Sequence, residues 1–136
     1  MTRLASHPVP DATGAAAQLF SAIQGAVGKV PNAYRDIGSN SPVVLESVLA
    51  LDASLKKTAL SARDIEVIKL AVSAANGCDY CVAAHSLMGK MAGLQPDALA
   101  AVRQGAATGN AREDALADFA RHLVTTRGTV EASVVE

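Results

Sequence analysis

The chain has 136 residues, of which 50% are hydrophobic but only 3% aromatic, and its formal net charge is −1. An apolar set dominated by alanine suits closely packed helices better than β-sandwiches or barrels. A near-neutral charge without a basic block excludes the electrostatic pattern of a nucleic-acid-binding protein. No stretch approaches the roughly 18 apolar residues of a membrane span, and residues 1–10 show no secretory signal. We therefore expect a cytoplasmic protein with neither a nucleic-acid nor a membrane partner.

The first helix is predicted over residues 11–27, after a lead over residues 1–10 that two prolines make extended or disordered. Residues 33–37 predict a short helix or turn before a break rich in glycine, serine and asparagine. Pro42 stands at a first-turn position with Ser41 as its cap, so a further helix starts there.

Two helices in the middle of the chain are separated by a strong stop. The first starts at the cap Ser61, has Asp64 at the third position of a capping box, and reaches about residue 75. The dipeptide Asn76-Gly77 ends it, because both residues tolerate the left-handed conformation. The second helix is predicted over residues 78–92, so the two are expected to form a hairpin.

The rest of the chain predicts a short helix over residues 96–104 and a last full helix over residues 111–127. Ser133 and Glu136 then repeat the spacing of a capping box, which fits either a frayed tail or a chain that continues. We find neither a strand signal nor an internal repeat. The expected fold is all-α, a bundle of about six helices in a single domain over residues 11–136.

Cys78, Cys81 and His85 lie within eight residues at the predicted start of a helix. Two cysteines three residues apart on a helix share a face at about 5–6 Å, close to the distance that a disulfide accepts. Free N–H groups and the positive end of the helix dipole favour a thiolate at Cys78. His85 lies one turn beyond Cys81 and can accept its proton or stabilise its thiolate. These features favour a redox centre.

Glu66 precedes Cys78 by twelve residues and is expected at the same height as His85. In a hairpin around Asn76-Gly77, the two residues differ by roughly 3 Å along the helix axis. A carboxylate that reaches the far nitrogen of His85 fixes the tautomer of the ring and raises its basicity. The order Glu66, His85, Cys81 therefore predicts a proton relay.

The run from Glu66 to His85 resembles the core of the alkylhydroperoxidase D family, within the carboxymuconolactone decarboxylase superfamily. The pattern is Glu, eleven residues, Cys, two residues, Cys, three residues, His, and it fits here without a gap. Residues 30–32 and 60–66 also resemble the flanks of that core. The likeness covers roughly residues 20–128.

The resemblance implies an all-helical subunit that assembles into trimers or hexamers and reduces alkyl hydroperoxides as a thiol peroxidase. Carried over to this chain, it implies that Cys81 attacks the peroxide and becomes a sulfenic acid, which Cys78 resolves as a disulfide. His85 and Glu66 would move the proton. A dithiol reductant, which in the best-known member is a lipoyl-bearing protein, would restore the thiols. We expect neither a cofactor nor a metal.

One position departs from the family pattern. The best-known members carry a histidine just before the second cysteine, where this chain has Tyr80. The Tyr80 hydroxyl can donate to a peroxide oxygen, which makes it a candidate auxiliary residue. Two other functions stay open. One is a carboxymuconolactone decarboxylase-like enzyme without thiol chemistry, and the other is a metal-binding or regulatory helical module that uses the same cysteine, histidine and glutamate side chains.

Overall fold

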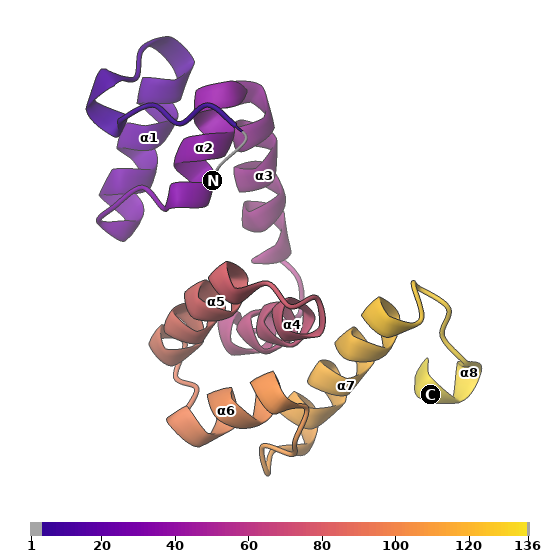
Figure 1. Cartoon of the computed structure of the whole chain (residues 1–136). Coiled ribbons are helices and arrows are strands. Elements are labelled where there is room, and N and C mark those ends of the chain that lie inside the picture. Colours follow the sequence, from indigo (N-terminus) through magenta and orange to yellow (C-terminus); the bar gives the residue numbers. More distant parts are fainter. Residues whose placement is uncertain (1–3, 136) are drawn as a thin grey trace. The chain divides into compact units, whose positions relative to one another are not determined.

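The computed structural model describes residues 4–135, and this range contains helices and connecting segments but no strand (Figure 1). The elements are η1 (Val9–Asp11), a 3₁₀ helix, and the α-helices α1 (Gly14–Val27), α2 (Asn32–Asn40), α3 (Pro42–Leu55), α4 (Ala62–Ala75), α5 (Asp79–Met91), α6 (Pro96–Gln104), α7 (Ala111–Thr125) and α8 (Ala132–Val135). The all-α prediction is confirmed. None of these helices is both long and apolar enough to cross a membrane.

The prediction of about six helices was too low, because α2 is a full helix and α8 is an additional short one. The sequence break that was expected to end α2 contains Gly38, which lies inside the helix and is buried. A Cβ atom at this position would lie 2.6 Å from Cε1 of Phe20 and 2.8 Å from Cδ2 of Leu45. Gly38 therefore allows α2 to pack closely, and it does not end the helix.

The helices fall into two compact units, Met1–Lys57 and Thr58–Glu136. The first unit holds η1 to α3 around a buried cluster of Phe20, Ile23 and Leu45. The prediction of one domain over residues 11–136 stays a prediction. The first three residues of the predicted lead, and Glu136 of the last predicted capping box, lie outside the described residues.

Helix α4 is the centre of the second unit, where α5, α6 and α7 all pack against it (Figure 1). The buried core of this unit consists of Val67, Leu70, Ala71, Leu94, Ala98, Leu99, Val102, Ala117 and Ala120. The alanines among them let the helix axes come close together. Because three helices enclose α4, the side chains of α4 that point at these helices have little freedom to move.

The start of α4 is held by the capping box that the sequence predicted, with Ser61 and Asp64 bonded to each other's backbone N–H groups. The same Asp64 carboxylate accepts two hydrogen bonds from Arg112 of α7, both of 3.0 Å. The guanidinium of Arg112 is the main reason why the pKa of Asp64 is lowered to about 2, and the backbone N–H of Ser61 adds to this effect. One carboxylate thus caps α4 and joins it to α7.

A second ion pair lies beside this one. Nε of Arg63 donates to Oε1 of Glu113 over 2.6 Å, and Glu113 is only 3% exposed. Nη1 of Arg63 donates to the carbonyl oxygen of Gly93, just after α5, over 3.1 Å. Arg63 therefore links the start of α4 to the start of α7 and to the end of α5.

Replacement of Arg112 is expected to reduce stability in a pH-dependent way. The folded pKa of Asp64 is about 2 and the unfolded value is about 3.9. The ionised carboxylate therefore stabilises the fold above about pH 4, and this contribution disappears as the pH falls towards 2. Because the Arg112 side chain is 62% exposed and solvent screens its charge, we expect Arg112→Met to cause only a small loss of the free energy of unfolding at pH 7.

Urea denaturation of Arg112→Met and the parent at a series of pH values from 2 to 7 measures this effect. Arg103→Met, which removes an exposed arginine from α6, is the control and should behave as the parent. A loss that is as large near pH 2 as at pH 7 would contradict the assignment to Asp64.

Candidate active site

The candidate site lies between α4 and α5, which a tight turn joins. Gly77 adopts a φ of 64°, in the left-handed region that favours glycine. The amide of Cys78 donates to the carbonyl oxygen of Ser73 over 3.0 Å. The chain therefore reverses at the predicted position, and α5 starts beside the end of α4.

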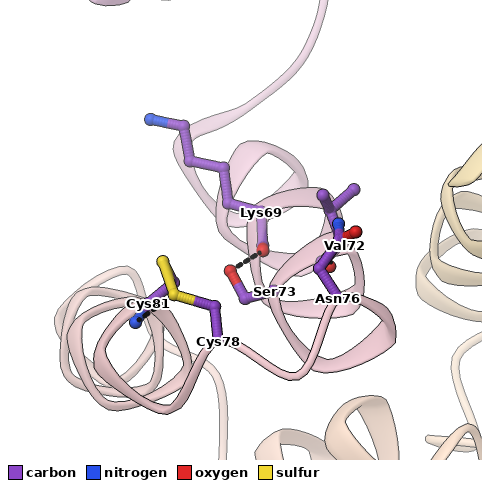
Figure 2. Close-up of a disulfide and its surroundings, with 6 residues drawn as sticks. All are labelled: Lys69, Val72, Ser73, Asn76, Cys78 and Cys81. Carbon is purple, nitrogen blue, oxygen red and sulfur yellow. Dashed lines mark hydrogen bonds between the residues drawn. A yellow bond between two sulfur atoms is a disulfide. The ribbon is translucent and has the colours of Figure 1, made fainter.

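Cys78 and Cys81 are joined by a disulfide, with their Cα atoms 5.3 Å apart (Figure 2). Cys78 is the N-cap of α5, and its Sγ accepts a hydrogen bond of 3.3 Å from the backbone N–H of Cys81. The first N–H groups of a helix and the positive end of its dipole stabilise negative charge. After reduction of the disulfide, Sγ of Cys78 therefore lies where a thiolate is favoured.

Figure 2 shows Ser73 on the side of α4 that faces this disulfide. Ser73 is buried, and its Oγ donates to the carbonyl oxygen of Lys69 over 2.6 Å. Ser73 was not among the residues predicted from the sequence. The sequence does hold a signal for this position. Ser73 follows Glu66 by seven residues, which is about two helical turns, so both side chains lie on one face of α4.

Glu66 and His85 meet between the two helices. Oε2 of Glu66 lies 2.8 Å from Nδ1 of His85, and the two side chains are 8% and 22% exposed. An ionised carboxylate can only accept, so Nδ1 of His85 carries the shared proton. In the neutral ring, Nε2 is then a free acceptor. The contact predicted from the hairpin is confirmed, whereas the role of the pair as a proton relay stays a prediction.

The four predicted side chains form two pairs, one cysteine–cysteine and one glutamate–histidine, and do not converge as one ligand set. Over residues 4–135, no group of three or more His, Cys, Asp or Glu could hold a metal ion. Tyr80 lies in the first turn of α5 and is 48% exposed. Its auxiliary role stays a prediction.

A search of protein families matches residues 42–129 to the carboxymuconolactone decarboxylase family. The chain belongs to this family. The matched range holds α3 to α7, and so both helices of the candidate site. The superfamily predicted from the run between Glu66 and His85 is therefore confirmed, whereas residues 20–41 of the expected likeness lie outside the match. A comparison with curated proteins found no match.

The capping role of Cys78 predicts a difference between two substitutions. In the reduced state, Cys78→Ser should retain the cap, because a serine Oγ accepts the same hydrogen bond, whereas Cys78→Ala should lose about 1 kcal/mol of folding free energy. Urea denaturation with excess reductant measures the difference, because the disulfide then makes no contribution. Cys81→Ser and Cys81→Ala are the control, since the side chain at position 81 does not cap α5. Equal stabilities of the two Cys78 variants would exclude the capping role.

Proposed function

We propose that this member of the carboxymuconolactone decarboxylase family is a thiol-dependent peroxidase and disulfide oxidoreductase that reduces alkyl hydroperoxides. The observation that carries the proposal is the bonded pair Cys78–Cys81 at the start of α5, with His85 one turn further and held by the buried Glu66. A nucleophile, a base and a carboxylate that orients the base are the parts that activated thiols use. The likeness to the alkylhydroperoxidase D family also supports this function.

The proposed oxidation starts from the two thiols. His85 takes the proton of Cys81, whose thiolate attacks the terminal oxygen of the hydroperoxide. The O–O bond breaks, the alkoxide leaves with the proton from His85 as an alcohol, and Cys81 is left as a sulfenic acid. Cys78 then attacks Sγ of Cys81, the S–O bond breaks, and water leaves with the Cys78 proton. Two thiols and one hydroperoxide thus give the disulfide, one alcohol and one water.

An external dithiol returns the two electrons by thiol–disulfide exchange. One of its thiolates attacks one sulfur of the Cys78–Cys81 bridge, and its second thiol then releases the mixed disulfide. A lipoyl-bearing protein is the proposed reductant, because the resemblance to the alkylhydroperoxidase D family implies it. Since dithiol reductants operate in the reducing cytosol, a cytoplasmic location is part of the proposal.

A homo-oligomer, either a trimer or a hexamer, is also part of the proposal. Large apolar side chains are exposed on α3, where Val43 and Leu51 are 70% and 63% exposed, and on α5, where Leu87 and Met91 are 53% and 81% exposed. Contact between subunits is one way to cover apolar side chains of this kind. Sedimentation equilibrium measures the assembled mass, and a purely monomeric protein would remove this part of the proposal.

Replacement of either cysteine is expected to stop the reaction, but at different steps. Cys81→Ser should abolish hydroperoxide consumption with dihydrolipoamide as reductant, because the attacking thiolate is absent. Cys78→Ser should stop after one turnover and retain a sulfenic acid on Cys81, which dimedone labelling and mass spectrometry detect. Turnover at the parental rate in both variants would exclude thiol chemistry from the reaction.

Glu66→Gln should leave the disulfide intact and slow the reaction. The amide keeps the size of the side chain but loses the charge that supports a protonated His85 ring, so hydroperoxide turnover should fall by about tenfold to a hundredfold. Glu46→Gln, which alters an exposed glutamate of α3, should keep the parental rate. Stopped-flow measurement of hydroperoxide consumption with dihydrolipoamide serves both variants. A parental rate in Glu66→Gln would remove the proton relay from the proposed mechanism.

A further inference from the structure

The start of α5 favours a thiolate on Cys78, whereas the proposed oxidation needs a thiolate on Cys81. Cys78 is the N-cap of the helix, and its Sγ accepts the backbone N–H of Cys81. Asp79, which lies between the two cysteines in the first turn, brings a negative charge that disfavours a thiolate beside it. A cation close to Cys81 would shift this balance towards the sulfur that the proposed oxidation uses.

Lys69 of α4 lies at nearly the same height of the hairpin as Cys81. The turn fixes the register of the two helices, because the amide of Cys78 donates to the carbonyl oxygen of Ser73 over 3.0 Å. Lys69 precedes Ser73 by four residues, and Cys81 follows Cys78 by three. At 1.5 Å per residue, they lie about 6 Å and about 4.5 Å from this level. Lys69 and Cys81 therefore differ by only about 1.5 Å along the hairpin.

On α4, Lys69 lies on the edge of the contact with α5 that faces away from the core. Glu66 and Ser73 mark the line of α4 that meets α5, because each of them is bonded to a residue of α5 or its cap. Leu70, which is buried in the core, lies on one side of this line. Since successive residues of a helix are about 100° apart, Lys69 lies on the other side.

On α5, Cys81 lies on the matching edge. Cys78 and His85 mark the line of α5 that meets α4, and Val82, on one side of it, packs against the same core. Cys81 therefore lies on the other side, as Lys69 does on α4. Both residues are half-buried, as expected at the edge of a contact between helices. Figure 2 shows the Lys69 side chain extending from α4 on the side of the hairpin on which Sγ of Cys81 lies.

We propose that the Lys69 ammonium stabilises the thiolate of Cys81, and so directs negative charge to the sulfur that attacks the hydroperoxide. This proposal rests on the proposed function for its catalytic meaning. Packed helices lie about 8–10 Å apart, and the flexible four-carbon stem of lysine carries its ammonium into this gap. A cation close to a thiol favours the ionised form and lowers the pKa of the thiol. Of the other charged groups on this stretch of the hairpin, Glu66 is bonded to His85, and Asp79 opposes the thiolate.

The pH midpoint for alkylation of Cys81 tests this proposal. Cys78→Ser keeps the cap and leaves one thiol, so iodoacetamide labelling of this variant at a series of pH values, followed by mass spectrometry, reports the ionisation of Cys81. In the same background, Lys69→Met removes the charge and should move the midpoint upwards by about one pH unit. Lys69→Arg keeps the charge and should retain the original midpoint. Lys90→Met, which removes an exposed lysine from the last turn of α5, is the control and should also retain it.

With both cysteines present, Lys69→Met should consume hydroperoxide about threefold more slowly near neutral pH, because a tenfold loss of thiolate is offset in part by its higher nucleophilicity. An unchanged alkylation midpoint in Lys69→Met overturns the proposal. An equal upward shift in Lys69→Arg also overturns it, because the effect would then come from the packing of the side chain and not from its charge. Lys69→Gln is a second uncharged variant, and it decides the question if Lys69→Met does not fold.

The alkylation midpoint is measured without hydroperoxide, which keeps the charge effect apart from the proposed function. A midpoint that Lys69→Met shifts, in a protein that consumes no hydroperoxide, would support the effect of Lys69 on Cys81 and overturn the peroxidase proposal. A parent that consumes hydroperoxide, together with an unchanged midpoint in Lys69→Met, would have the opposite meaning.

Discussion

The contact between Glu66 and His85 is the interaction on which the candidate site depends. Glu66 belongs to the central helix of its unit and is buried, so its carboxylate has lost most of its water and needs a partner that donates to it. The imidazole on α5 is that partner. The pair therefore has two effects at once: it satisfies a buried carboxylate between two helices, and it fixes which nitrogen of His85 remains free to accept a proton. The packing of α5 on α4 and the chemistry of the ring cannot change independently.

The two helices contribute different properties to the site. Helix α4 supplies the carboxylate from a position that α5, α6 and α7 enclose. Helix α5 supplies the sulfurs at its first turn, where Cys78 and Cys81 are only half-buried and where free backbone N–H groups favour negative charge. Under the proposed function, a thiol that meets both a small peroxide and a larger reductant must be accessible, whereas a proton relay works best with little water around it. The half-buried sulfurs at the start of α5 and the more buried glutamate–histidine pair one turn further along are compatible with these two requirements.

The helix pattern and the central part of the site could be predicted from the sequence because they follow from short-range rules. Asn76-Gly77 sets the point of reversal, and similar counts of residues on either side of it put Glu66 and His85 at nearly the same height. Packing between distant segments follows no such rule. Gly38 was interpreted as part of a break, but it lies within α2. Phe20, which belongs to another helix, occupies the space that a side chain at this position would need.

The glycines of this chain show the difference between a feature that follows from a short-range rule and one that follows from packing between distant segments. Gly77 has a φ of 64° and no atom within 4 Å of an added Cβ, so its value is conformational and can be anticipated from the turn. Gly38 and Gly89 are helical, and their value lies in the side chain that they lack. The composition makes such positions important. A chain with 3% aromatic residues fills its core mainly by bringing small and aliphatic side chains close together, so helix spacing is set by single methyl groups.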